Sequence, residues 1–145
     1  LGSPGVVLTA GRRDIVDADG ATVMRGWGLR GLGRRMPGSE AVRRAVRAGS
    51  NLFGEPASVM MRRDVLEAVG GWFDRFPYLI DQATYSRVLL RGDFVPDPEV
   101  GATFRMSASQ WSVALVRDQS AQARAFHAWL RAEHPDVLGE GDRRT

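Results

Sequence analysis

Asp17 and Asp19 lie one residue apart in the stretch DIVDADGATV. Carboxylates in such an Asp-x-Asp pair can hold a divalent cation against a nucleotide diphosphate. The stretch also fits a tight β-hairpin, because short apolar runs flank Asp19-Gly20 and both of these residues tolerate a positive φ. A metal site would need further phosphate-binding partners. We therefore interpret the pair as the tip of a hairpin and assign no metal ligand to the chain.

Asp81 is a second candidate for chemistry. It follows the apolar stretch FPYLI and stands at the predicted start of a helix over residues 81–92. The dipole of that helix would favour the ionised form of the carboxylate. When the residue is considered alone, we prefer a structural role as the N-cap of that helix.

Gly26, Gly28 and Gly31 match the pattern G-x-G-x-x-G. A dinucleotide-binding fingerprint leads directly into a helix, whereas Pro37 and Gly38 separate these glycines from the next helical pattern. We therefore do not assign a Rossmann site. We interpret residues 25–38 as a solvated, flexible loop, with contact to a diphosphate or an acidic lipid surface through its arginines as the alternative. These arginines are Arg25, Arg30, Arg34 and Arg35.

His127 and His134 are seven residues apart, so both can lie on one side of a helix. Two histidines without a third ligand do not define a metal site, and we interpret them as structural or surface residues. The chain has no G-x-S-x-G motif and no cysteine, so covalent hydrolase chemistry has no support.

The remaining patterns alternate between strands and helices. A strand is expected at residues 6–9, a hairpin at 15–24 and a strand near 57–62. Helices are expected at 39–48, 64–69, 81–92 and 112–133, the last with Phe126, Trp129 and Leu130 facing inward. Residues 93–106 should be extended but broken by Pro96 and Pro98.

The fold class expected from these elements is α/β, with a short mixed sheet, a β-hairpin and three to four helices. There are too few strands for a full doubly wound sheet, which suggests part of a larger fold. We expect one unit over residues 1–135 and a flexible polar tail over 136–145.

Composition excludes several classes. All 20 basic residues are arginine, yet the net charge is only +3 and the arginines are spread along the chain, so nucleic-acid binding is not expected. No apolar run approaches the ~20 residues needed to span a bilayer. We expect a cytoplasmic protein, with peripheral membrane contact through the arginine-rich loop as an open alternative.

Short motifs follow one another from Asn51 onward: Asn51, Gly54, Pro56 and Ser58; Arg62 and Arg63; Gly70, Gly71 and Trp72; Asp81; Gly92 and Asp93; Phe104 and Arg105. Their order and spacing resemble the second half of the catalytic domain of family 2 glycosyltransferases, which have the GT-A fold. The resemblance covers about residues 5–112. It implies a partial GT-A-like fold and a transferase that uses a nucleotide-diphospho-sugar donor and a sugar or lipid acceptor.

The resemblance also implies roles for individual residues. Asp81 matches the general base that takes the proton from the acceptor hydroxyl. Gly70, Gly71 and Trp72 match the turn that shapes the acceptor pocket, and Arg105 is a further acceptor-binding candidate. The full-length parent is expected to need Mg²⁺ or Mn²⁺, and this chain alone is expected to bind none.

Two departures from the family pattern leave an alternative open. Ile80 stands where relatives often have a second acid, and Met106-Ser107 replaces a histidine. The nucleotide-binding half is missing, so the isolated chain is expected to be inactive. The alternative is a non-catalytic, degenerate transferase-like module that binds a glycan, a membrane surface or a protein partner.

Overall fold

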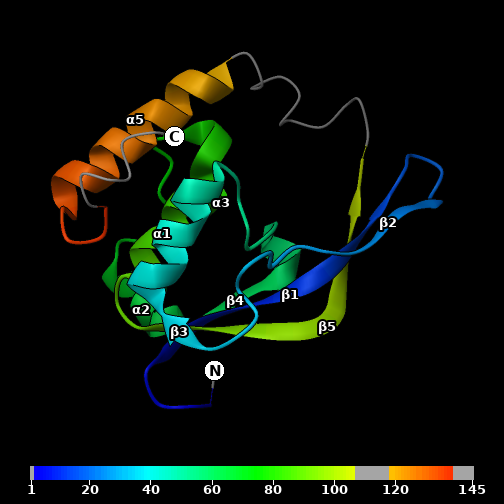
Figure 1. Cartoon of the computed structure of the whole chain (residues 1–145), viewed down its shortest axis with the longest axis horizontal. Coiled ribbons are helices and arrows are strands. Elements are labelled where there is room, and N and C mark those ends of the chain that lie inside the picture. The colour runs from blue at the N-terminus through cyan, green and yellow to red at the C-terminus, as the bar shows by residue number, and fades with distance from the viewer. Residues whose placement is uncertain (1, 107–117, 139–145) are drawn as a thin grey trace.

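Strand β1 (Val6–Val16) organises the sheet, because it pairs with three other strands. The computed structural model describes residues 2–106 and 118–138. In it, β1 runs parallel to β5 (Asp93–Arg105) along its whole length. The other edge of β1 pairs antiparallel with β4 (Val59–Met61) and then with β2 (Thr22–Trp27). The short β3 (Met36–Pro37) pairs with β5. The chain is therefore α/β with one mixed sheet, as predicted (Figure 1).

Four α-helices lie in the described residues: α1 (Gly38–Ala48), α2 (Arg63–Ala68), α3 (Ile80–Leu89) and α5 (Gln119–Glu133). Two 3₁₀ turns, η1 (Pro56–Ser58) and η2 (Pro77–Leu79), precede β4 and α3. The helices gather at one end of the sheet, and the β1–β2 hairpin extends away from them (Figure 1). None of these helices is long and apolar enough to cross a bilayer.

The predicted hairpin between β1 and β2 is confirmed. The Asp17 side chain builds the turn, since its Oδ1 accepts hydrogen bonds from the backbone N–H groups of Asp19 (3.0 Å) and Ala21 (2.9 Å). Gly20 has φ +93°, a value that glycine adopts without strain. Arg105, at the end of β5, donates from Nη1 to the carbonyl oxygen of Ala18 (2.7 Å) and so ties the hairpin tip to the sheet.

The predicted interruption of residues 93–106 is wrong, because β5 continues through both prolines. Gly11 pairs with Asp97 but Arg12 pairs with Val100, so two residues of β5 bulge out between these pairs. Pro98 lies in this bulge, where no ladder hydrogen bond is required from its nitrogen.

Helix α1 begins at Gly38 with Pro37 as its N-cap, two residues before the N-cap expected at Ser39. Gly38 packs directly against the end of α3, and its N–H donates to the carbonyl oxygen of Gly92 (2.9 Å). A Cβ at this position would overlap the carbonyl oxygens of Leu89 and Gly92. Tertiary packing, rather than a side-chain cap, therefore sets the start of this helix.

Helix α5 turns Phe126 and Leu130 into the core, with Trp129 packed against it, as predicted. The expected start of this helix at residue 112 falls on residues 107–117, which lie outside the described part. Beyond the helix, Val137 and Leu138 are also buried. The packed part of the chain therefore continues to Leu138 instead of ending at residue 135, because these two apolar side chains join the core.

Candidate functional site

A cavity of about 460 Å³ lies between the start of α3, the loop before η1, and α5. Its lining combines two carboxylates with amide and aromatic side chains. The polar and ring-bearing residues include Asn51, Glu55, Tyr78, Asp81, Gln82 and His127. Carboxylates, amides and rings together suit a ligand with several hydroxyl groups, which needs both hydrogen-bond partners and apolar faces.

Asp81 lines this cavity from the first turn of α3. The N-cap of the helix is Leu79, so the sequence interpretation of Asp81 as a simple N-cap is wrong. Burial, together with the charge of Glu55, raises the pKa of Asp81 to about 6. This direction is opposite to the one expected from the helix dipole alone, because loss of hydration outweighs the dipole. At neutral pH Asp81 is thus an ionised carboxylate that accepts a proton readily.

Glu55 is held in place by Arg13, which is only 5% exposed although it lies on β1. The Arg13 Nη2 donates to Glu55 Oε1 (3.2 Å), and the Arg13 Nε forms an ion pair with Glu55 Oε2. Arg13 Nη1 is buried and makes no hydrogen bond within the described residues. A buried guanidinium with a single carboxylate partner fixes that carboxylate strongly, because leaving the cation unpaired would be costly.

The loop that carries Glu55 is built by its neighbours. The Asn51 side chain donates to the carbonyl oxygen of Gly54 (2.8 Å) and accepts from the N–H of Phe53 (3.2 Å). Gly54 has φ +100°, and a Cβ there would overlap Ser58 Oγ. The Ser58 hydroxyl in turn donates to the backbone carbonyl of Glu55 (2.9 Å). The series of Asn, Gly and Ser residues noted in the sequence therefore serves to present Glu55.

Tyr85 lies one turn after Asp81 on α3, and its ring is fully buried. Burial and the charges of Asp81 and Glu55 raise the pKa of its phenol well above the usual range. The turn at Gly70 and Gly71, both with positive φ, places Trp72 beside it, with ring centroids 6.3 Å apart. Trp72 is 46% exposed and lies next to Tyr85 without lining the cavity.

Arg105 is not brought to the cavity. Its guanidinium binds the hairpin tip, whereas the preceding residue, Phe104, lines the cavity wall.

The two histidines lie in different surroundings. His127 lines the cavity from α5, and burial lowers its pKa, so it is neutral at pH 7. His134 packs against the Trp129 ring instead, with centroids 6.2 Å apart. Residues 2–106 and 118–138 contain no group of three or more His, Cys, Asp or Glu side chains arranged to hold a metal ion.

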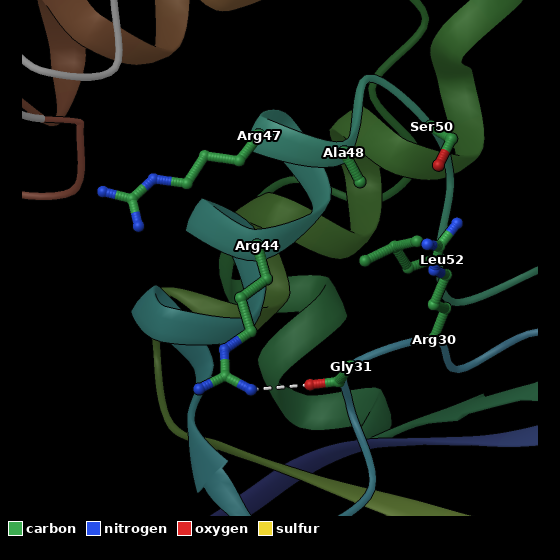
Figure 2. A pocket seen from close by; sticks show the side chains of 7 residues that line it. All are labelled: Arg30, Gly31, Arg44, Arg47, Ala48, Ser50 and Leu52. Atoms are coloured by element: carbon green, nitrogen blue, oxygen red, sulfur yellow. Dashed lines mark hydrogen bonds between the residues drawn. The ribbon is translucent and has the colours of Figure 1, made fainter.

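A second cavity, of about 490 Å³, lies at the end of α1 and includes Arg30, Arg44 and Arg47 in its lining. Figure 2 shows that these side chains point in different directions and do not converge on one point. Arg44 Nη1 donates to the carbonyl oxygen of Gly31 (2.6 Å). Arg30, Arg44 and Arg47 therefore form a basic surface around this cavity and do not form a binding site for a single phosphate group.

Comparison of the chain with protein-family models, with curated proteins and with solved structures gives no significant match. The fold and the site define an α/β chain with a cavity lined by two carboxylates. The function proposed below therefore depends on the geometry of that cavity and on the motifs in the sequence.

Sequence reasoning identified Asp81 but missed Arg13, Glu55, Tyr85 and His127. An arginine within the strand pattern VVLTAGRRDIV could have indicated a buried charge that needs a partner. Glu55 stands between Gly54 and Pro56, where the proline restricts the backbone of Glu55 and the glycine allows a positive φ before it. Tyr85 falls inside the helix predicted over residues 81–92 without any feature that marks it as functional, and His127 was interpreted as a structural or surface residue.

Proposed function

We propose that this chain is the acceptor-side part of a nucleotide-diphospho-sugar-dependent glycosyltransferase of the GT-A type, similar to family 2, in which Asp81 is the general base. One observation carries the proposal. Asp81 is a partly buried carboxylate with a pKa of about 6, and it faces a cavity whose lining suits a sugar. A base of this strength is ionised at neutral pH and accepts a proton better than an exposed aspartate.

In the proposed reaction, the acceptor hydroxyl oxygen attacks the anomeric carbon of the donor sugar. A new C–O bond forms, the bond to the nucleoside diphosphate breaks, and Asp81 receives the hydroxyl proton. Residues outside these 145 would hold the donor and the Mg²⁺ or Mn²⁺ ion that neutralises its diphosphate. Trp72 lies outside the cavity, and its exposed ring could contact a further sugar of the acceptor.

Asp81→Asn tests this proposal. In the gene product that contains this chain, the substitution is expected to lower kcat by about 10²- to 10⁴-fold, because the amide cannot take up the proton. Release of nucleoside diphosphate in the presence of acceptor is the measurement. The matched control is Asp74→Asn, which changes an exposed aspartate and should leave kcat unchanged. Turnover by Asp81→Asn within about threefold of the wild type would rule out the assigned base.

The isolated 145-residue chain is expected to be inactive. Tight, metal-dependent binding of a UDP- or GDP-sugar to it would contradict the proposed division between donor and acceptor parts. The non-catalytic module would instead be favoured by a full gene product that binds a glycan but shows no turnover, and whose glycan affinity is unchanged by Asp81→Asn.

The basic surface in Figure 2 supports a further proposal, a peripheral contact with anionic lipid on the cytoplasmic face of a membrane. Each arginine near such a surface contributes about 1 kcal/mol, so the double substitution Arg30→Ser, Arg47→Ser is expected to weaken binding by about 30-fold. Co-sedimentation with phosphatidylcholine vesicles, with and without phosphatidylglycerol, measures the effect. Arg91→Ser, which changes an exposed arginine near the end of α3, is the control. Equal sedimentation with both vesicle types would refute the contact.

A further inference from the structure

We propose that Arg13 and Glu55 form a positioning pair for Asp81, in which Arg13 fixes Glu55 at the wall of the cavity and Glu55 keeps Asp81 a ready proton acceptor. The inference goes beyond the assignment of the base, because it adds two residues from other elements. The role of this pair in catalysis rests on the proposed function. The ionisation of Asp81 can nevertheless be measured without any turnover.

The first support is that the fold makes room for the Arg13 guanidinium. Gly28 and Gly54 both lie against it, and both have positive φ, of +115° and +100°. A Cβ would come within 2.7 Å of Arg13 Nη1 at Gly28 and within 2.8 Å at Gly54. Two loops distant in sequence therefore each use a glycine where a side chain would displace the arginine. Such an enclosure restricts the arginine to the position in which it holds Glu55.

The second support is that Glu55 and Asp81 line the same cavity from different elements. Glu55 is on the loop before η1, and Asp81 is on α3. The Glu55 side chain is 32% exposed, so its charge is only partly hydrated. The negative charge of Glu55 disfavours the ionised form of the Asp81 carboxylate in the same cavity. Arg13 neutralises this repulsion only in part, because it binds Glu55 and not Asp81.

The groups around Asp81 come from several elements. Tyr85 follows on α3, Tyr78 lies on η2, and His127 faces the same cavity from α5. His127 is neutral at pH 7 because burial lowers its pKa. Burial and the charges of Asp81 and Glu55 raise the pKa of the Tyr85 phenol, and the charge of Arg13 lowers it. Among the cavity-lining residues, the charge that raises the pKa of Asp81 is therefore that of Glu55, in addition to burial.

The direct test is the pKa of Asp81 in the 145-residue chain, followed by the ¹³C resonance of its carboxyl carbon during a pH titration. Glu55→Gln removes the neighbouring charge and is expected to lower this pKa by up to about one unit, since burial, the larger cause, remains. Glu67→Gln changes an exposed glutamate on α2 and should leave the pKa unchanged. An Asp81 pKa that is the same in Glu55→Gln and in the wild type would overturn the proposal.

Glu55→Gln leaves Arg13 buried without its ionic partner, so the variant could fail to fold. The double substitution Arg13→Met, Glu55→Gln removes both charges. It is expected to lower the pKa of Asp81, as Glu55→Gln alone does. Arg13→Met alone leaves Glu55 charged and is expected to raise the pKa further. A pKa that falls in Arg13→Met would contradict the assignment of Glu55 as the acting charge.

The catalytic arm uses the gene product that contains this chain. If Asp81 is the base, the acidic limb of the kcat–pH profile should move to lower pH in Glu55→Gln by the same amount as the titrated pKa. A shifted pKa with an unmoved limb would overturn the catalytic role of the pair. A wild-type gene product without turnover at any pH would overturn the proposed function and leave the titration result standing.

Discussion

Gly38→Ala is expected to lower the free energy of unfolding by about 3 kcal/mol and the midpoint of thermal unfolding by about 10 °C. The added methyl group would overlap the carbonyl oxygens of Leu89 and Gly92, which are backbone atoms and cannot rotate away. Helix α1 would have to move from the end of α3. The hydrogen bond from the Gly38 N–H to Gly92, worth about 1 kcal/mol, would weaken with it. Urea and thermal unfolding followed by circular dichroism measure both quantities.

Gly33→Ala is the matched control, because it makes the same chemical change in the loop before α1. A Cβ at Gly33 meets no atom within 4 Å, and its φ is outside the left-handed region. This variant is expected to remain within about 1 kcal/mol of the wild type, with a small gain from the stiffer unfolded chain. Equal stability of Gly38→Ala and Gly33→Ala would show that α1 does not pack against α3 as closely as described.

Asp81→Asn is expected to raise the free energy of unfolding at pH 7 by about 1–2 kcal/mol, although it should abolish the proposed catalysis. The pKa of Asp81 is about 6 in the folded chain, against 3.8 for the ordinary value. The full difference would correspond to about 3 kcal/mol. Solvent reaches part of the side chain and reduces this figure. Stability gained together with activity lost is the relation expected of a strained functional group.

The pH dependence gives this prediction its sign. Between about pH 4 and pH 6 the folded chain binds more protons at Asp81 than the unfolded chain does, so the stability contributed by this residue falls as the pH rises through that range. The difference between Asp81→Asn and the wild type should therefore be small below about pH 4 and reach its full size above pH 6. Asp74→Asn, at an exposed position, should show no such dependence. A pH-independent difference for Asp81→Asn would contradict the raised pKa.

Local patterns in the sequence predicted the hairpin and the positions of the helices, because turn residues and apolar spacing act over a few residues. Asp19-Gly20 specified the turn, and Gly49 ended α1 in the left-handed conformation expected of it. Features that depend on distant contacts could not be predicted in this way. Helix α1 starts at Gly38 because of α3, and β5 runs through Pro98 because β1 lies beside it.

In the candidate site, too, local patterns could be predicted from the sequence and features that depend on distant contacts could not. Asp81 could be identified from its place between an apolar stretch and a helix. Its raised pKa depends on burial in the folded chain and on Glu55, which is 26 residues earlier in the sequence. The buried position of Arg13 depends on glycines in two other loops. Arg105 was assigned to acceptor binding from its motif, yet the hairpin carbonyls, more than 80 residues away in sequence, determine where its side chain lies.

The parallel pairing of β1 with β5 has a consequence for how the chain folds. Val6 pairs with Asp93, so the central ladder of the sheet closes a loop that includes α1, α2 and α3. Pairings of such high contact order form slowly, because the entropy of closing the loop is lost before the new contacts stabilise it. We therefore expect the hairpin and the helices to form early in refolding, and docking of β5 onto β1 to limit the rate. Strand β5 is the longest partner of β1 and the last strand in the sequence. Most of this chain must therefore emerge from the ribosome before the sheet can be completed.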